Sequence, residues 1–196
     1  MLQEHDRHVK IVVPENGFIS LNTPLDSNRI GSLSTKTTHP EYMAMLQKTW
    51  DALEMNAEPV FPYMYKTKGE VLKECINQNL LNRLVLDSNS CGKYQRHKLQ
   101  QCGVCVPCLV RRAAFLEAGL QDNTTKRYVY ENLKHSDSHD LAAVAMAVKQ
   151  VELQGVERFI RSSLSFASGE ERKKLLGVVS RGIAELNNLL RSYGVL

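Results

Sequence analysis

Four of the five cysteines in this chain have the spacing of a metal-binding motif. Cys91, Cys102, Cys105 and Cys108 follow the pattern C-x10-C-x2-C-x2-C. A gap of two residues lets a tight turn bring two thiolates to one ion, and a more distant thiolate can complete a tetrahedron at about 2.3 Å per zinc–sulfur bond. The residue types and their spacing therefore predict a Zn²⁺ ion held by these four cysteines.

The charges around the cysteines favour the same interpretation. No Asp or Glu occurs between Ser88 and Phe115. Five basic residues lie in that segment: Lys93, Arg96, Lys98, Arg111 and Arg112. Four thiolates around Zn²⁺ leave an excess of negative charge, and nearby cations would stabilise both that excess and the thiolate form. The formal net charge of the whole chain is only +4, which is too mild by itself to indicate a nucleic-acid partner.

Three other states of the cysteines are possible alternatives to a zinc site. Disulfides are disfavoured because the chain has five cysteines and no apolar export signal at Met1. An iron–sulfur cluster is a closer rival, since C-x2-C-x2-C also occurs in ferredoxins, but the fourth cysteine lies upstream here. Unmetallated thiols are the third alternative. With four protein ligands the zinc has no open position, so it would hold a loop together and would not activate water.

The elements that must position these residues are predicted from turn signals and apolar periodicity. Strands are expected at Val9–Val13, Phe18–Leu21, Val60–Tyr65 and Leu84–Leu86. Helices are expected from Pro40 to about Leu53, from a capping box at Thr67–Glu70 to about Asn79, over Leu109–Ala118, over Leu141–Gln154, and from a second capping box at Ser168–Glu171 to Gly194. Strands that alternate with helices predict an α/β protein with a helical tail.

Apolar residues at helical spacing indicate which helix faces are buried. In the helix after Pro40 the stripe is Tyr42, Leu46, Trp50 and Leu53. In the helix after Thr67 the stripe is Val71, Leu72, Cys75 and Ile76, which makes Cys75 a small core residue. In the last helix it is Leu175, Val179, Ile183, Leu186 and Leu190. With 43% apolar and 23% charged residues the chain has the composition of a globular protein.

Several motifs occur together along the chain. They are Thr67-Lys68-Gly69-Glu70, Asp87-Ser88-Asn89-Ser90-Cys91, and the run Cys102-Gly103-Val104-Cys105-Val106-Pro107-Cys108 through Arg111-Arg112 to Phe115 and Ala118-Gly119. This set resembles the C-terminal half of the 7-cyano-7-deazaguanine synthase (QueC) family. Upstream lie Pro14-Glu15-Asn16-Gly17-Phe18, Asn22, Pro24, Arg29 and Ser34-Thr35-Lys36-Thr37-Thr38-His39-Pro40. That segment is similar to the QueC-like proteins of Qat anti-phage defence systems, which often carry Arg where Lys36 stands.

The resemblance implies a fold and an activity. The fold would be part of a Rossmann-like α/β domain of the adenine nucleotide alpha-hydrolase, or PP-loop, type. Residues 1–86 would form the C-terminal part of this ATP pyrophosphatase domain, residues 87–120 the zinc-binding subdomain and residues 121–196 the helical tail. The activity would be that of an ATP-dependent ligase, which activates a deazaguanine-type carboxylate as an acyl-adenylate and then forms an amide. Zn²⁺ and ATP are the cofactors that this implies.

The family binds phosphates in a loop of the form Ser-Gly-Gly-x-Asp-Ser. Adjacent glycines let successive backbone amides turn toward the phosphate oxygens. This chain has 11 glycines but no Gly-Gly pair. We therefore expect it to lack the PP-loop segment, to act only alongside that segment or other Qat-system proteins, and to be inactive toward ATP by itself.

The resemblance implies contacts to substrate or nucleotide for eight residues. They are Arg29, Ser34, Lys36, Thr37, Thr38, His39, Lys68 and Arg111. The cations would pair with phosphate or carboxylate, the hydroxyls would donate hydrogen bonds, and His39 would exchange a proton near neutral pH. A simpler interpretation of residues 29–40 is a loop that satisfies its own backbone, with Thr38 capping the next helix. No catalytic residue is assigned. His135 and His139 have metal-compatible spacing, but the residues beside them are typical of a helix start.

Two functions of other classes compete with this one. The first is a zinc knuckle that binds nucleic acid through its basic residues, although only Tyr94 and Phe115 in that segment could stack on bases. The second is a structural subunit that contacts Qat proteins through its tail, which an exposed apolar stripe over Leu175–Leu190 would support. A homodimer is compatible with either of these two functions. The longest apolar run, Leu141–Val148, is too short to cross a bilayer, so the sequence predicts a soluble, cytoplasmic protein without membrane contact.

Overall fold

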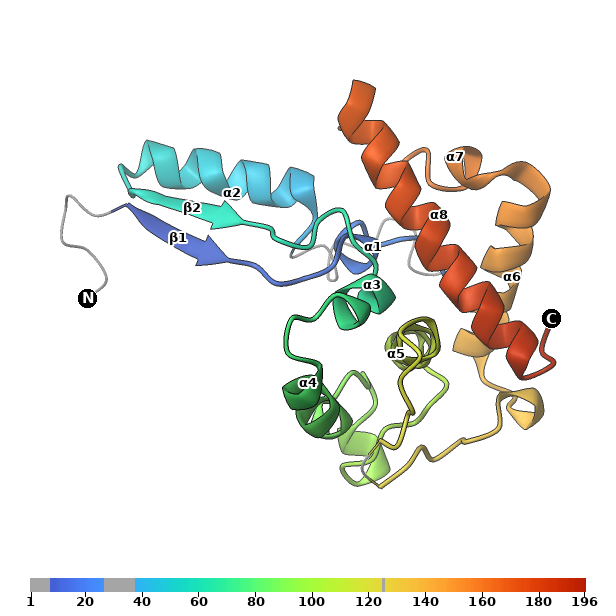
Figure 1. Ribbon diagram of the computed structural model, residues 1–196. Helices are drawn as coiled ribbons and strands as arrows, with labels where there is room; N and C mark the ends of the chain where they lie inside the picture. The colour runs from blue at the N-terminus through green and yellow to red at the C-terminus, as the bar shows by residue number, and fades with distance from the viewer. Residues whose placement is uncertain (1–7, 27–37, 125) are drawn as a thin grey trace.

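The computed structural model describes residues 8–26, 38–124 and 126–196, and these are mostly helical (Figure 1). The two strands are β1 (Val9–Val12) and β2 (Ala57–Val60). The helices are α1 (Gly17–Ser20), α2 (Pro40–Ala52), α3 (Lys68–Lys73), α4 (Gln78–Leu84), α5 (Val106–Glu117), α6 (His139–Gln154), α7 (Val156–Phe159) and α8 (Gly169–Ser192). Short 3₁₀ turns are η2 (Val85–Asp87), η3 (Gln95–His97) and η4 (Leu133–His135). None of the described helices is both long and apolar enough to span a bilayer.

The strands form a two-stranded parallel sheet. The register runs from Val9 opposite Ala57 to Val12 opposite Val60. Helix α2 lies between the strands in the chain and runs alongside β2 (Figure 1). Parallel strands need such a crossover, because a tight turn can join only antiparallel ones. The described residues thus combine one β–α–β unit with a larger helical body, which confirms a mixed α/β architecture at this coarse level.

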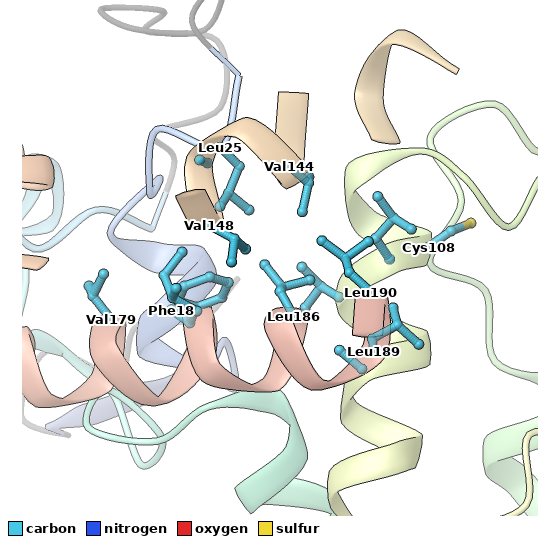
Figure 2. Packing of buried hydrophobic residues seen from close by; sticks show 14 of the residues in the cluster. Phe18, Leu25, Cys108, Val144, Val148, Val179, Leu186, Leu189 and Leu190 are labelled. Carbon is cyan, nitrogen blue, oxygen red and sulfur yellow. The ribbon is translucent and has the colours of Figure 1, made fainter. Parts of the chain in front are cut away.

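The core of the helical body is built on α8. Residues from α1, α6 and α8 point into one apolar cluster, while the sulfur of Cys108 on α5 points away from α8 (Figure 2). The stripe predicted on the last helix is confirmed, because its residues are at most 5% exposed: Leu175, Val179, Ile183, Leu186 and Leu190. Gly182 allows the close approach of α1, since a Cβ at this position would lie 2.2 Å from Cδ2 of Phe18.

Three of the four predicted strands are corrected by the structure. Phe18–Leu21 is wrong as a strand, because Asn16 caps α1: its side-chain oxygen accepts a hydrogen bond from the amide of Ile19 at 3.2 Å. The strand predicted at Val60–Tyr65 lies earlier, as β2, and ends at Val60. Leu84–Leu86 is wrong as a strand and forms the end of α4 and the turn η2. Short apolar runs do not distinguish a strand from a turn of helix, and here the caps decide.

The Thr67 capping box is confirmed, but the helix that follows it is shorter than predicted. The amide of Thr67 donates to Oε2 of Glu70 at 2.8 Å, and the amide of Glu70 donates to Oγ1 of Thr67 at 3.1 Å. Helix α3 ends at Lys73. The side-chain amide of Gln78 donates hydrogen bonds to the carbonyls that end the helix and follow it, those of Leu72, Lys73 and Cys75. As a result Ile76 is fully exposed.

Other helix predictions are partly corrected. Cys75 is half-buried and does not belong to the core. Helix α2 is confirmed, but its N-cap is His39, whose Nδ1 accepts from the amide of Glu41 at 3.3 Å, and not Thr38. The stripe on α2 is not buried, because Tyr42 and Leu53 are exposed. The second capping box is wrong, since Ser168 caps α8 without a side-chain hydrogen bond.

A buried carboxyl group joins α8 to the start of α3. Glu185 accepts hydrogen bonds from the hydroxyl of Thr67 and the amide of Gly69, and it is 6% exposed. Burial raises the pKa of Glu185 to about 7, and the charges of Glu117 and Glu70 act in the same direction, while the hydrogen bond from Thr67 opposes them. The protonated form is therefore the one that the folded protein favours.

This carboxyl group predicts a pH-dependent stability. The folded pKa of about 7 lies above the ordinary value of 4.5, so stability is fully present below pH 4.5 and is lost as the pH rises through 7. Glu185→Gln cannot ionise, and we expect it to exceed the wild-type free energy of unfolding by roughly 2–3 kcal/mol at about pH 8 and to match it near pH 4.5. Urea unfolding over this pH range measures the difference. Glu170→Gln, on the exposed side of the same helix, serves as the control; identical pH profiles for Glu185→Gln and wild type would refute the assignment.

Candidate metal centre and the adjoining basic cluster

The four cysteines predicted as ligands converge on one buried point. Their Sγ atoms all lie within 4.8 Å of one another, and the pairs Cys102–Cys108 and Cys91–Cys105 are each 3.9 Å apart. Each cysteine is at most 6% exposed. Four sulfurs at about 2.3 Å from a central Zn²⁺ would be about 3.8 Å apart in a tetrahedron. The arrangement therefore fits a metal ion of the size and preference of zinc.

The local backbone explains how the sulfurs meet. Cys105 caps α5 and Cys108 lies in its first turn. Backbone amides point at the sulfurs: those of Lys93 and Cys102 donate to Sγ of Cys91, and that of Cys105 donates to Sγ of Cys102, each at 3.3 Å. Gly103 turns the loop with a φ of 85°, and a Cβ there would lie 2.7 Å from the carbonyl oxygen of Tyr130.

Electrostatics within the cluster favour a bound cation. Side-chain hydrogen bonds with Cys105 and Cys108 lower the pKa of Cys102. The hydrogen bond to Cys102 raises the pKa of Cys105 to about 12, and it also raises the pKa of Cys108. A thiolate is thus favoured at Cys102, and a bound cation would displace the protons of Cys105 and Cys108. The positive N-terminal end of α5 also favours negative charge at this point.

The basic residues of this segment divide into two groups. Lys93 lies beside the cluster: burial alone would lower its pKa, but the hydrogen bond to Asp140 at 3.1 Å and the charges of Cys102 and Cys105 raise it. Arg96 and Lys98 are exposed. Arg111 and Arg112 face the interior, and neither forms a hydrogen bond to a cysteine sulfur in the described parts of the chain. The predicted compensation of the cluster's negative charge is thus supported for Lys93, whose charge acts on Cys102 and Cys105, and direct contact with the sulfurs is not seen for the arginines.

Arg112 connects the cysteine loop (residues 91–108) to the segments that pack around it. Its guanidinium donates to three backbone carbonyls: those of Gly103 at 3.2 Å, Tyr130 at 3.1 Å and Glu131 at 2.6 Å. It also lies between two aromatic rings, with Cζ 4.8 Å from the ring centroid of Tyr128 and 4.7 Å from that of Tyr193. Arg112 is 5% exposed, so these contacts are shielded from water.

Arg111, one turn after Cys108, is the deepest charged side chain. It is 1% exposed, and its guanidinium donates to Oγ of Ser88 at 2.6 Å and to the carbonyl of Val85 at 2.7 Å. Its Nε is buried without a hydrogen-bond partner. Within residues 8–26, 38–124 and 126–196, Arg111 forms no ion pair with a carboxylate. A buried cation supported only by neutral groups is costly unless an anion reaches it.

Lys68 lies close to Arg111 and adds a second cation. Its Nζ donates to Oγ of Ser90 at 3.2 Å. Burial and the charge of Arg111 lower the pKa of Lys68, whereas the charges of Glu15 and Cys108 oppose that shift. Lys68, Arg111 and Glu15 thus form one cluster beside the cysteines, which we call the basic cluster.

The sheet explains why the basic cluster forms where it does. Glu15 follows the carboxyl end of β1, and Lys68 follows the carboxyl end of β2 after a short connection. Because the strands are parallel, their carboxyl ends lie at the same end of the sheet. Thr38 also lies here, since its hydroxyl donates a hydrogen bond to Oε2 of Glu15 at 2.8 Å. Ligands of α/β proteins bind outside the carboxyl ends of parallel strands, which is the position of this cluster.

The predicted contact residues are therefore brought together only in part. Thr38 contacts Glu15, and Lys68 lies near both Glu15 and Arg111. His39 is buried, caps α2 and packs edge-on against Phe166, with ring centroids 5.1 Å apart. The other four predicted residues lie outside the described residues: Arg29, Ser34, Lys36 and Thr37.

Glu15 was not among the residues predicted from the sequence. It belongs to the segment Pro14-Glu15-Asn16-Gly17-Phe18, which is part of the family resemblance but implies no contact for Glu15. Its position directly after an apolar strand is the signal that could have identified it, because polar residues at that point face the ligand side of a parallel sheet. That signal becomes useful only when β1 is known to be parallel to β2.

A second group of possible metal ligands is occupied by other interactions. Asp26, His139 and Asp140 have side-chain atoms within 4.8 Å of one another. However, Asp140 already accepts a hydrogen bond from the ammonium group of Lys93. His135 does not belong to the group, in agreement with the interpretation of this segment as a helix start, since α6 begins at His139.

Comparisons of the chain with protein-family models, curated proteins and solved structures found no match.

Proposed function

We propose that this chain is the zinc-bearing C-terminal part of a QueC-like ATP-dependent ligase that acts in anti-phage defence. In this proposal the ligase forms an acyl-adenylate on a deazaguanine-type carboxylate and then an amide. The chain carries the anion-binding half of the site and works with the segment that bears the PP-loop. The β–α–β unit would belong to a larger Rossmann-like sheet.

The observation that carries the proposal is the position of the basic cluster. Lys68, at the start of the helix that follows β2, lies close to the buried Arg111 and next to the cysteine centre. Adenylate formation needs cations to hold phosphate oxygens and a carboxylate in a site from which water is excluded. The resemblance of the motifs around Lys68 and Arg111 to the family points to the same residues.

Each residue has a definite task in this proposal. Arg111 and Lys68 bind the anionic group, and the hydroxyls of Ser88 and Ser90 keep the two cations in place. Glu15 orients Lys68 through its negative charge. Glu15 is itself held by the hydrogen bond that it accepts from Thr38. Zn²⁺, when bound to the four cysteines, supplies structural cross-linking of the loop from which α5 and Arg111 start.

The structure lends less support to the competing functions. Of the five basic residues proposed for a nucleic-acid contact, Arg111 and Arg112 are internal and Lys93 is paired with Asp140. Phosphate binding by a zinc knuckle would therefore depend on Arg96 and Lys98. The apolar stripe of α8, which would support a tail that binds partner proteins if it were exposed, is buried in the core.

The isolated, zinc-loaded chain is expected to bind pyrophosphate without turning over ATP. Lys68→Met should weaken pyrophosphate binding at least tenfold, because it removes one of two cations from a site of low dielectric constant. Lys73→Met, on the same helix and with a side chain that is 63% exposed, is the matched control and should change little. Isothermal titration calorimetry measures the affinities, and ATP–pyrophosphate exchange measures turnover. Equal affinities for both variants, or turnover by the chain alone, would contradict the proposal.

A further inference from the structure

Glu185 of α8 holds the two residues that flank Lys68. Its carboxyl group accepts hydrogen bonds from the hydroxyl of Thr67 and from the amide of Gly69. The approach is close, because a Cβ at Gly69 would lie 2.7 Å from Oε1 of Glu185. Glu185 itself is 6% exposed. The side chain of Lys68 therefore starts from a short stretch of backbone that one buried group fixes on both sides.

A second residue of α8 contacts the same turn from the solvent side. Arg181 lies one helical turn before Glu185, and its guanidinium donates to the carboxylate of Glu70 at 2.5 Å and to the carbonyl of Tyr65 at 2.9 Å. Its side chain is 47% exposed, so water and salt screen this ion pair. Glu185 has no such partner, because none of the ion pairs among the described residues includes it. The buried contact is therefore the one that responds to a change of charge.

The charges that act on Glu185 come from the helices packed around it. Glu117 of α5 and Glu70 of α3 are acidic, and both oppose its ionisation. Each of them has a cation of its own, since Lys73 lies 3.8 Å from Glu117 and Arg181 lies 2.5 Å from Glu70. Helix α1, which also packs on α8, carries no charged residue. Burial and the two acidic neighbours raise the pKa of Glu185 to about 7, so it changes its charge near neutral pH.

We propose that Glu185 is a positioning residue for Lys68, and that protonation of Glu185 is coupled to anion binding at the basic cluster. This inference rests on the proposed function, in which Lys68 and Arg111 bind the anion, and it adds the group that regulates that site. When Glu185 is protonated, a neutral carboxyl group holds the start of α3, and Lys68 reaches Ser90 close to Arg111. When Glu185 is ionised, an unpaired charge is left in the interior. Movement of the start of α3 away from α8 exposes this charge to water and withdraws Lys68 from the anion.

The coupling between proton and anion is reciprocal. Since the proton on Glu185 favours anion binding, the bound anion must raise the affinity of Glu185 for its proton by the same factor. With a coupling of about tenfold, Glu185 is mostly ionised in the free protein at about pH 7.5 and mostly protonated in the complex. Binding then takes up roughly half a proton at this residue. The anion also titrates, and Glu185→Gln, which cannot ionise, is the reference for that contribution.

Isothermal titration calorimetry with pyrophosphate tests this coupling in the full zinc-loaded chain. Wild type and Glu185→Gln should bind pyrophosphate equally at about pH 5.5, and wild type should bind it about fivefold more weakly than Glu185→Gln at about pH 8. Titrations at about pH 7.5 in two buffers of different ionisation enthalpy should show that wild type takes up roughly half a proton more than Glu185→Gln. Glu170→Gln, at an exposed position of α8, is the matched control and should follow wild type at every pH.

Circular dichroism at each pH distinguishes positioning of Lys68 from a purely structural role of Glu185. If wild type loses affinity only at pH values where it has begun to unfold, the role of Glu185 is structural and the inference is wrong. Parallel pH profiles for wild type and Glu185→Gln, with equal proton uptake, would also overturn it. The proposed function still stands in both cases if Lys68→Met weakens pyrophosphate binding as expected. No binding of pyrophosphate by wild type at any pH would remove the proposed function, and this inference with it.

Discussion

Cys102→Ser is expected to abolish stoichiometric zinc binding and to destabilise the protein more than any other single substitution considered. Cys102 is fully buried, and its sulfur accepts a hydrogen bond from the amide of Cys105. The same sulfur lies 3.9 Å from the sulfur of Cys108. Structural zinc sites contribute roughly 10 kcal/mol or more of apparent binding free energy, which is coupled to folding. We expect the thermal midpoint to fall by about 10 °C or more, or the cooperative transition to disappear.

The fifth cysteine provides the control for this experiment. Cys75→Ser changes the same atoms at a half-buried position outside the cluster. It should bind one zinc per chain and melt within a few degrees of wild type. Metal analysis by mass spectrometry and differential scanning calorimetry give the two readouts. If Cys102→Ser and Cys75→Ser behave alike, the four cysteines do not form a metal centre.

Arg112→Met is expected to have the second largest effect, about 3–5 kcal/mol of lost stability with zinc still bound. The variant keeps the length of the side chain but leaves the carbonyls of Gly103, Tyr130 and Glu131 without their donor. Each hydrogen bond from a charged group contributes about 1.5–3 kcal/mol, and the two ring contacts add to this. The zinc ligands are unchanged, so metal content should be unchanged.

A nearby exposed arginine provides the control that distinguishes the loss of buried contacts from the loss of a positive charge. Arg127 has a side chain that is 81% exposed and forms an exposed ion pair with Glu131 at 3.6 Å. Arg127→Met should therefore cost no more than about 1 kcal/mol. Urea denaturation of the zinc-loaded proteins compares the two variants. A loss of similar size for both would mean that the contacts of Arg112 do not hold the cysteine loop to the rest of the fold.

The parts of the site that are local in sequence could be predicted. The spacing of Cys102, Cys105 and Cys108 is set by one turn and the start of α5, so the sequence alone predicts that they meet. The apolar stripe of α8 could be predicted for a similar reason, because a helix of 24 residues repeats its pattern many times. The Thr67 capping box depends on residues only three apart.

The parts that depend on distant contacts could not be predicted. Phe18 packs on Gly182 of α8, a contact 164 residues away in the chain that no local pattern indicates. Glu15 becomes a site residue only because β1 and β2 are parallel. Arg111 and Arg112 differ in their partners although they are adjacent, since successive residues of a helix face different neighbours.

The metal centre and the basic cluster are coupled through α5. Cys108 and Arg111 are three residues apart on this helix, and the cysteine lies in the four-cysteine cluster while the arginine extends toward Ser88 and Lys68. Residue positions three apart on a helix lie on neighbouring parts of one face. A metal ion bound to Cys108 would therefore also fix the position of Arg111, which binds an anion in the proposed function.

X-ray absorption spectroscopy of the purified chain tests the central claim, that four cysteine sulfurs hold one zinc ion, most directly. The account predicts a zinc edge with a single shell of four sulfur neighbours at about 2.3 Å. A shell that contains nitrogen or oxygen, an iron–sulfur spectrum, or no bound metal would contradict it.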